Sequence, residues 1–238
     1  RDAKYDLETR FASGIVLEEF GAILYPEPPE SAPENNGGIS IEDDVRILFL
    51  SANPTTTSSL DLENEIRTLR RELKAVDYRD RIELIWAPAA RPDDLIEILR
   101  SKRPNVLHFS GHGSKDGIFM RSASDDLVVV DAKPLRRALK DRGLKLVVLN
   151  SCFSESQGAR LSDVATAVVG TTDAVRDVDA QQFSKAFYRT IGNGHSIQDA
   201  FRDAGDSIEL EGGVDVFRSF GDLSLVLLKD NRGSACSN

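Results

Sequence analysis

Two short apolar runs that each end at small polar residues constrain this chain more than any other feature. The first is VLHFSGHG, from Val106 to Gly113, and the second is LVVLNSC, from Leu146 to Cys152. Branched apolar runs that stop abruptly are typical of buried parallel strands. If the two strands are neighbours in one sheet, His112 and Cys152 both emerge at its carboxyl edge, where open α/β sheets place their chemistry.

His112 and Cys152 form a chemically sensible pair. A thiol attacks only as the thiolate, and a nearby imidazole can take its proton and later return it to a leaving amine. Gly111 and Gly113 carry no side chain that would hold a substrate backbone away, and the amides of Gly113 and Cys152 could stabilise an oxyanion. The pattern predicts a cysteine peptidase site with His112 as the general base.

Other interpretations of these residues are structural. A cysteine at a strand end is commonly a small core residue, and a histidine between glycines can be a turn residue. A metal site built from His108, His112 and Cys152 is disfavoured, because the chain has no second ligand pair at finger spacing and the glycines exclude a helical ligand face. We expect no metal and no cofactor, and we interpret His108 as a core residue within its strand.

The blocks FSGHG, LVVLNSCFS, AVVGTTDAV and FSKAFYRTIGNGHSIQDAFRDA resemble the CHAT group of caspase-like peptidases, relatives of caspases, metacaspases and separases. The segment RILFLSANPTTTSSLDLENEIRTL is similar to the first strand and helix of such domains. The resemblance extends from Val45 to Leu228. It implies an α/β caspase-like three-layer sandwich, with a mostly parallel central sheet and helices on both faces.

The resemblance also implies a function. The expected protein is a thiol protease and hydrolase of the prokaryotic cytoplasm that acts in antiviral defence or programmed cell death. It would cleave a specific protein partner, gasdermin-like proteins being one such target in the family. An alternative from another class is an interaction module of caspase fold with vestigial chemistry; the presence of both His112 and Cys152 argues against it.

Four residues are expected around the substrate: Ser110, Asn150, Thr172 and Asp173. Metacaspases carry an acidic residue two positions before the cysteine, whereas this chain has the neutral Asn150. We therefore expect an uncharged or weakly discriminated side chain before the scissile bond, because a buried cation needs a carboxylate partner. Asp173 is the nearby candidate carboxylate, in the loop from Thr171 to Asp179, although a solvated acidic loop is its simplest interpretation.

Composition narrows the class of protein. The 238 residues suffice for one α/β domain and an appendage, and the net charge of −9 argues against a nucleic-acid partner. Two cysteines give no disulfide framework, which fits a reducing cytoplasm. We expect no membrane segment and no signal peptide. Because the chain begins with Arg1, it is expected to be a fragment or a processed product, and an upstream regulatory domain or an activator protein is an expected partner.

The chain divides into four segments by composition. We predict an amino-terminal extension over residues 1–25, a linker rich in Pro, Glu and Gly over 26–43, a caspase-like peptidase domain over 44–230 and a polar tail over 231–238. Cys236 falls in the tail and is taken as incidental. A Rossmann-like nucleotide-binding domain is disfavoured, because the turn after the first strand, residues 52–56, contains no glycine.

Within the domain, apolar periodicity predicts strands alternating with helices, and hence a mostly parallel sheet. The predicted strands are 45–51, 82–87, 106–111, 146–150, 167–171 and 223–228, with a hairpin over 118–130. The first helix is predicted to begin with a capping box of Ser58 and Asp61 and to place Glu65 on its solvated face. Pro92 opens a helix with Ile96 facing inward, and His195 is expected near the start of the last helix.

Overall fold

The computed structural model describes residues 44–54, 57, 60–124 and 126–229. The predicted extension, linker and tail (1–25, 26–43 and 231–238) lie outside the described residues, as do Ser58 and Cys236. The described residues all fall within the predicted domain, 44–230.

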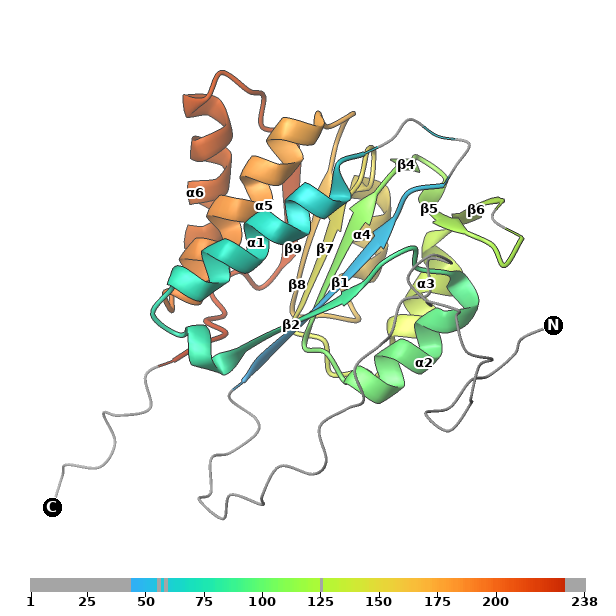
Figure 1. Cartoon of the computed structure of the whole chain (residues 1–238), viewed down its shortest axis with the longest axis horizontal. Coiled ribbons are helices and arrows are strands. Elements are labelled where there is room, and N and C mark those ends of the chain that lie inside the picture. Colours follow the sequence, from blue (N-terminus) through green and yellow to red (C-terminus); the bar gives the residue numbers. More distant parts are fainter. Residues whose placement is uncertain (1–43, 55–56, 58–59, 125, 230–238) are drawn as a thin grey trace, which may run out of the picture. The chain divides into compact units, whose positions relative to one another are not determined.

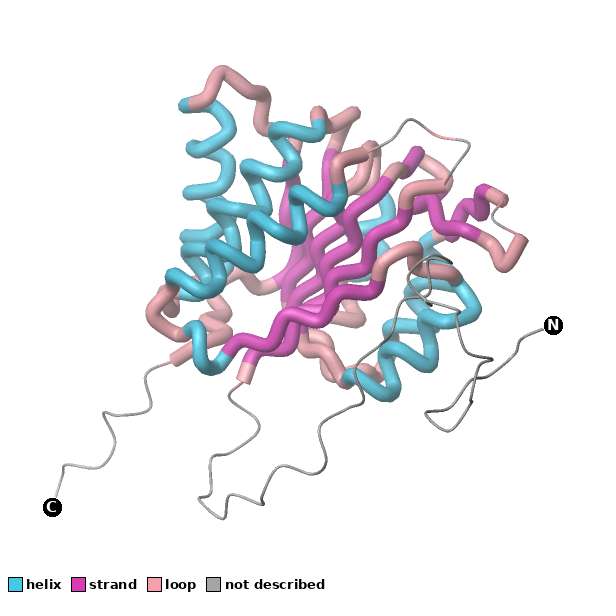
Figure 2. The backbone as a smooth tube through the Cα atoms, in the orientation of Figure 1, coloured by secondary structure: helices cyan, strands magenta, loops and turns pink. Residues whose placement is uncertain are grey.

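Six of the described strands form the central sheet, which Figures 1 and 2 show between its helices. Their order across the sheet is β2 (Ile82–Ala87), β1 (Val45–Ala52), β3 (Val106–Gly111), β7 (Leu146–Asn150), β8 (Ala167–Thr171) and β9 (Phe217–Gly221). The first five are parallel to one another, and β9 runs antiparallel to β8. A small second sheet contains β4 (Gly113–Ser114), β5 (Gly117–Arg121) and β6 (Leu127–Val130). The predicted hairpin and mostly parallel sheet are thus confirmed.

Helices cover both faces of the sheet (Figure 1). On one face lie α1 (Leu62–Ala75), α5 (Asp177–Gly192) and α6 (Ile197–Leu210). On the other lie α2 (Pro92–Lys102), α3 (Ala132–Leu139) and α4 (Glu155–Leu161). The inner strands β1, β3, β7 and β8 are buried on both sides, which explains their runs of branched apolar residues, whereas the edge strands β2 and β9 are partly exposed.

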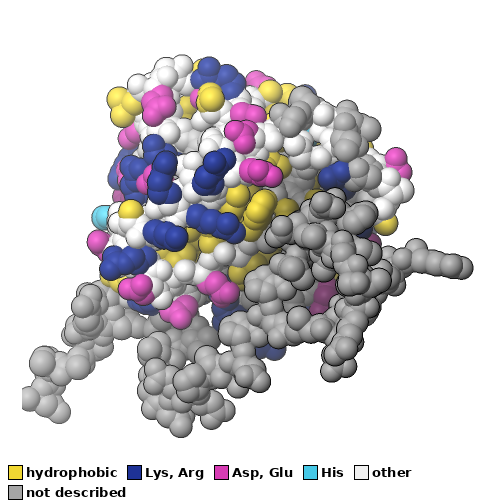
Figure 3. All heavy atoms as spheres, viewed as in Figure 1, with side chains coloured by type: hydrophobic (Ala, Val, Ile, Leu, Met, Phe, Trp, Pro, Cys, Tyr) yellow, Lys and Arg dark blue, Asp and Glu magenta, His cyan; other side chains and the backbone are white. Residues whose placement is uncertain are grey.

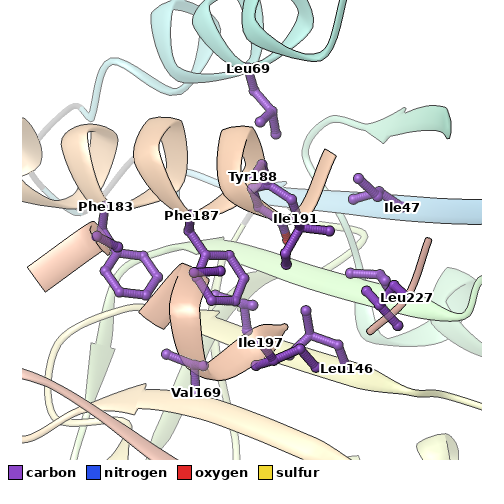
Figure 4. Packing of buried hydrophobic residues seen from close by; sticks show 14 of the residues in the cluster. Ile47, Leu69, Leu146, Val169, Phe183, Phe187, Tyr188, Ile191, Ile197 and Leu227 are labelled. Atoms are coloured by element: carbon purple, nitrogen blue, oxygen red, sulfur yellow. The ribbon is translucent and has the colours of Figure 1, made fainter. Parts of the chain in front are cut away.

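The core is therefore split by the sheet into two apolar layers. Alternate residues of β1 enter different layers: Ile47 and Phe49 pack under α1 and α5, whereas Leu48 and Leu50 pack towards α2. The layer under α5 is rich in aromatic rings, and Figure 4 shows Phe183, Phe187 and Tyr188 projecting from that helix towards the sheet. This tight packing holds α1 and α5 at fixed positions above the ends of β3 and β7.

The helix starts differ in detail from the prediction. Asp61 itself caps α1, its Oδ1 accepting a hydrogen bond from the Asn64 amide at 3.2 Å, so the predicted capping box with Ser58 is wrong. Pro92 opens α2 as predicted, but Ile96 is 46% exposed because it lies off the stripe formed by Leu95 and Leu99.

The outer face of α1 is basic. Figure 3 shows Lys and Arg side chains gathered on this side of the molecule, beside apolar side chains. Arg67, Arg70 and Lys74 line a shallow groove with Trp86 of β2, and the Arg70 guanidinium lies 5.6 Å from the Trp86 ring centroid. Arg67 and Arg70 are exposed, as predicted for the charged face of this helix.

The predicted strand at 223–228 is wrong. The last strand is β9, and it ends at Gly221, whose φ of +87° favours glycine. The following segment instead closes the amino-terminal end of α6, because the Leu225 and Leu223 carbonyls accept hydrogen bonds from the Ile197 and Gln198 amides at 3.0 and 2.8 Å. Apolar composition alone did not separate a strand from this helix-covering segment.

Candidate active site

Strands β3 and β7 are neighbours, and this brings His112 and Cys152 together. Ser110 pairs with Asn150 in the parallel register, so His112 and Cys152 each follow the paired position by two residues. Both side chains are partly exposed and line one cavity of about 380 Å³ at the carboxyl edge of the sheet. The predicted juxtaposition is therefore present in the fold.

Four segments build the wall of this cavity. They are the start of α1, the ends of β3 and β7, and the stretch that leads from β8 into α5. The polar and charged lining residues include Asp61, Glu65, Ser110, Asn150, Arg176 and Asp177, together with His112 and Cys152. The site thus draws on parts of the chain that are far apart in sequence.

The glycines beside His112 admit neighbouring backbone. A Cβ added to Gly113 would lie 2.9 Å from the Cys152 carbonyl oxygen and 3.0 Å from Ser151 Oγ. A Cβ added to Gly111 would lie 2.6 Å from the Ala52 carbonyl oxygen. Both approaches are too close for a side chain, so the glycines let the His112 segment pack directly against the Cys152 segment and β1.

The loop that carries Cys152 is firmly anchored. The next residue, Phe153, has a φ of +57°, a left-handed conformation that a bulky residue adopts only where its surroundings impose it. Buried Ser154 donates to the Leu149 carbonyl at 2.8 Å and accepts from the Thr171 amide at 3.0 Å. The Thr171 hydroxyl donates to the Ser151 carbonyl at 2.6 Å. These bonds fix the turn that presents the thiol.

The thiol of Cys152 faces the loop before α5. Its Sγ lies 4.0 Å from the Val175 carbonyl oxygen, which is the long contact expected for a weak S–H donor. Cys152 is partly exposed, unlike a structural core cysteine. The structure therefore favours the reactive interpretation of this residue over the structural one.

A buried polar cluster, here called the Glu65 cluster, lies beneath the cavity. It comprises Glu65, His108, Ser110, Asn150, Ser184 and Tyr188. The Glu65 carboxylate accepts hydrogen bonds from Ser110 Oγ at 2.5 Å, Ser184 Oγ at 2.9 Å and Asn150 Nδ2 at 3.1 Å. Buried polar groups need such partners, so the cluster links α1, β3, β7 and α5 into one unit.

His108 occupies the inner end of the Glu65 cluster. Its ring stacks on Phe49 with centroids 4.7 Å apart, its Nδ1 lies 3.0 Å from the Tyr188 hydroxyl, and its Nε2 lies 3.5 Å from Glu65 Oε1. Burial, and secondarily the charge of Glu65, raise the pKa of Tyr188 well above its usual range. The hydroxyl therefore stays protonated beside the histidine, and the interpretation of His108 as a core residue is confirmed.

The structure places the sequence-predicted residues in two groups. His112, Cys152, Ser110 and Asn150 line the cavity. Thr172 Oγ1 instead donates to the Val216 carbonyl at 3.1 Å. Asp173 is exposed, and its Oδ1 accepts from the Ala174 amide at 2.7 Å. The structure therefore does not place Thr172 and Asp173 in the cavity wall.

Glu65 is the site residue that sequence reasoning missed. It was predicted on the solvated face of the first helix, yet it is 4% exposed and lines the cavity. Its position three residues after Leu62 and four before Leu69 lies on the inward stripe of α1, which was the available signal. A carboxylate on an inward stripe needs buried donors, and Ser110, Asn150 and Ser184 supply them.

The residues considered for a metal site fall in two places. His108 lies in the core beside Tyr188 and Glu65, its Nε2 without a hydrogen-bond partner among the described residues, whereas His112 and Cys152 line the cavity. Across the described parts of residues 44–229, no group of three His, Cys, Asp or Glu side chains is arranged to hold a metal ion. In the same residues, no helix combines the length and apolarity that crossing a membrane requires.

Comparison with known proteins agrees with this architecture. The CHAT domain model matches residues 25–211. A "Roc-COR-CHAT protease" from an unknown prokaryotic organism is 27% identical over 174 residues, which are 69% of this chain and 16% of that protein. A "Probable protease" of Gillisia limnaea is 25% identical over 154 residues, 63% of this chain and 27% of that protein. The chain thus spans less than a third of the length of either relative.

A solved structure supports the fold independently. The complex of Porphyromonas gingivalis RgpB pro- and mature domains matches with a TM-score of 0.53 and 15% identity, covering 79% of this chain and 50% of that one. Likeness at this identity concerns the fold, and it confirms the expected caspase-like α/β sandwich. With the family model covering well over half of its residues, the chain belongs to the CHAT domain family.

Proposed function

We propose that this chain is a cysteine endopeptidase in which Cys152 and His112 form the catalytic dyad. The observation that carries the proposal is their placement at equivalent ends of neighbouring strands, in the wall of one cavity. The names of the two relatives, both proteases, support it. A reactive pair at the carboxyl edge of a parallel sheet is where α/β enzymes build their sites.

The proposed reaction follows from the two side chains. His112 takes the proton of the Cys152 thiol, and the thiolate attacks the scissile carbonyl carbon. His112 then gives that proton to the leaving amine as the C–N bond breaks, which leaves a thioester on Cys152. Water, deprotonated by His112, hydrolyses the thioester and frees the second product. The Gly113 and Cys152 amides are the proposed donors to the oxyanion.

We extend the proposal to biology through the family resemblance. The enzyme would cleave a specific protein partner in the prokaryotic cytoplasm as a defence or cell-death effector, with a gasdermin-like protein as one candidate substrate. The two relatives are much longer than this chain, which fits control by further domains or by an activator protein. Function at this level rests on analogy with the family and not on a residue of the site.

The test is cleavage of a peptide library by the purified chain, read by mass spectrometry. Cys152→Ala should reduce cleavage to background, and His112→Ala should lower the rate at least about a hundredfold, the usual scale for loss of a general base. Cys236→Ala is the matched control and should cleave like the wild type. Cleavage that persists in Cys152→Ala would refute the mechanism, and an inert wild type would favour the interaction module.

A further inference from the structure

The floor of the cavity presents two kinds of acceptor, a carboxylate and an amide oxygen that has no donor among the described residues. Glu65 and Asn150 both line it, although they are 4% and 3% exposed. Asn150 Oδ1 is buried and has no hydrogen-bond partner among the described residues. Leaving a buried acceptor unpaired costs free energy, so this oxygen marks a place where a ligand donor would be stabilising.

The orientation of the Asn150 amide is set by its neighbours. Nδ2 lies 3.1 Å from Glu65 Oε1 and 3.2 Å from the Ala180 carbonyl oxygen. A carboxylate and a carbonyl are acceptors only, so the group that faces them must be the NH₂. The opposite end of the amide is therefore the oxygen, and the unpaired atom is an acceptor.

The Glu65 carboxylate adds negative charge to the same floor. Three neutral donors, from Ser110, Ser184 and Asn150, occupy three of its roughly four acceptor positions. Among the described residues that contact this carboxylate, only His108 is able to carry a positive charge. A cation entering the cavity would therefore meet a carboxylate that is hydrogen-bonded but still able to accept.

Other charged groups of the wall favour the same kind of ligand. Asp61 and Asp177 line the cavity as well. Arg176, a cation of the wall, is held by Asp179 through contacts of 2.7 and 2.8 Å from Nε and Nη2. Its charge is thus largely offset by a carboxylate of its own, and the balance of the described wall is negative.

We propose that this cavity binds the basic side chain, arginine or lysine, of the substrate residue that precedes the scissile bond, with Glu65 and Asn150 Oδ1 as its acceptors. The proposal rests on the proposed peptidase function, since Cys152 in the same wall would hold the carbonyl of that residue. A guanidinium offers five donors and an ammonium three, whereas a leucine side chain offers none. The neutral Asn150 alone favours an uncharged substrate residue before the scissile bond. The sequence pattern does not assign Glu65 to the site, and its carboxylate changes that expectation.

The first test is a series of matched fluorogenic peptides that differ only at this residue, cleaved by the full chain. Arginine or lysine should exceed leucine, methionine and asparagine in kcat/KM by about a hundredfold, because leucine and methionine offer no donor to Asn150 Oδ1 and asparagine brings no positive charge to Glu65. Glu65→Gln should reduce that preference to less than about tenfold. Glu63→Gln, the same substitution at an exposed position of α1, is the matched control and should keep it.

A second measurement does not depend on turnover or on a Glu65 variant that folds. N-acetyl-arginine amide should slow alkylation of Cys152 by iodoacetamide in the wild type, whereas the neutral isostere N-acetyl-citrulline amide should not. Equal protection by the two compounds would overturn the proposal. So would equal cleavage of all peptides, which would leave the peptidase function intact, or a basic preference that Asp173→Asn abolishes and Glu65→Gln retains.

Discussion

Strands β3 and β7 present side chains to both faces of the sheet, and the two faces differ in polarity towards the carboxyl ends of the strands. The face towards α2, α3 and α4 carries the apolar side chains of Leu107, Phe109, Val147 and Leu149. The face towards α1 and α5 is apolar at its start but ends in the polar side chains of His108, Ser110 and Asn150. Both faces are fully buried, so exposure does not explain the difference.

The contrast shows where function lies in this fold. Burying polar groups costs free energy unless they are hydrogen-bonded, so a chain selected for stability alone would make both faces apolar. The polar residues gather on one face around Glu65, directly beneath the cavity that holds His112 and Cys152. We infer that the apolar face serves folding and that the polar face serves substrate binding.

The largest expected effect on stability comes from the apolar face. Leu149 is completely buried, so Leu149→Ala should lower the free energy of unfolding by about 2–5 kcal/mol through lost burial and a new cavity. Urea unfolding measures this, and the alkylation rate of Cys152 in the folded fraction should stay unchanged. The matched control Ile96→Ala, at a site 46% exposed, should change stability by less than about 0.5 kcal/mol. Equal losses of unfolding free energy in the two variants would show that the apolar face does not stabilise the fold more than an exposed site does.

A smaller effect is expected on the polar face. Ser110→Ala removes a hydrogen bond of 2.5 Å to the Glu65 carboxylate. Because hydrogen bonds to charged groups contribute about 1.5–3 kcal/mol, the free energy of unfolding should fall by that amount. Ser101→Ala, at an exposed serine of α2 whose Oγ donates to the Ile98 carbonyl, is the control and should change stability by less than about 0.5 kcal/mol. If urea unfolding shows an equally small change in the free energy of unfolding for Ser110→Ala, the Glu65 cluster does not stabilise the fold.

The smallest effect at neutral pH is expected for Tyr188→Phe, which removes the hydroxyl 3.0 Å from His108 Nδ1 and should cost about 0.5–1.5 kcal/mol. Its pH dependence is more informative. An unfolded tyrosine ionises near pH 10, whereas burial and the charge of Glu65 raise the folded pKa well above that.

The sign of the pH effect follows from which state loses its proton first. Below about pH 10 both states keep the Tyr188 proton, and the hydroxyl adds no pH dependence. Above it the unfolded state ionises first, so the free energy of unfolding falls as pH rises towards the folded pKa. Urea unfolding from pH 7 to 11 should show a shallower fall in Tyr188→Phe than in the wild type. Parallel curves would mean that Tyr188 is not held in its neutral form.

Sequence periodicity predicted the main features of the fold. Strands such as 82–87 and 167–171 match the structure, because each is a short apolar run bounded by turns or helix starts. The segment 223–228 did not, since its apolar side chains bury equally well as a cover for α6. The local pattern of apolar residues indicates that a segment is buried. Whether that segment pairs as a strand depends on the elements that it contacts in the fold.

The site was predicted in part for a similar reason. His112 and Cys152 could be paired because both follow strands, and strand ends meet at one edge of a parallel sheet. Glu65 could not be assigned to the site in this way, because its helix carries acidic residues on its outer face as well. Its place on the inward stripe of α1 indicates burial, but its donors Ser184 and Asn150 lie more than eighty positions away, and no local pattern reports which donors it meets.

Alkylation of Cys152 by iodoacetamide tests most directly whether His112 and Cys152 act together, because no substrate is needed. The rate is measured against pH in the wild type, in His112→Ala and in the control His195→Ala, whose histidine is exposed before α6. If the two residues are coupled, His112→Ala slows alkylation at neutral pH and changes its pH profile, while His195→Ala does neither. An unchanged rate and profile in His112→Ala would show that the two residues are uncoupled.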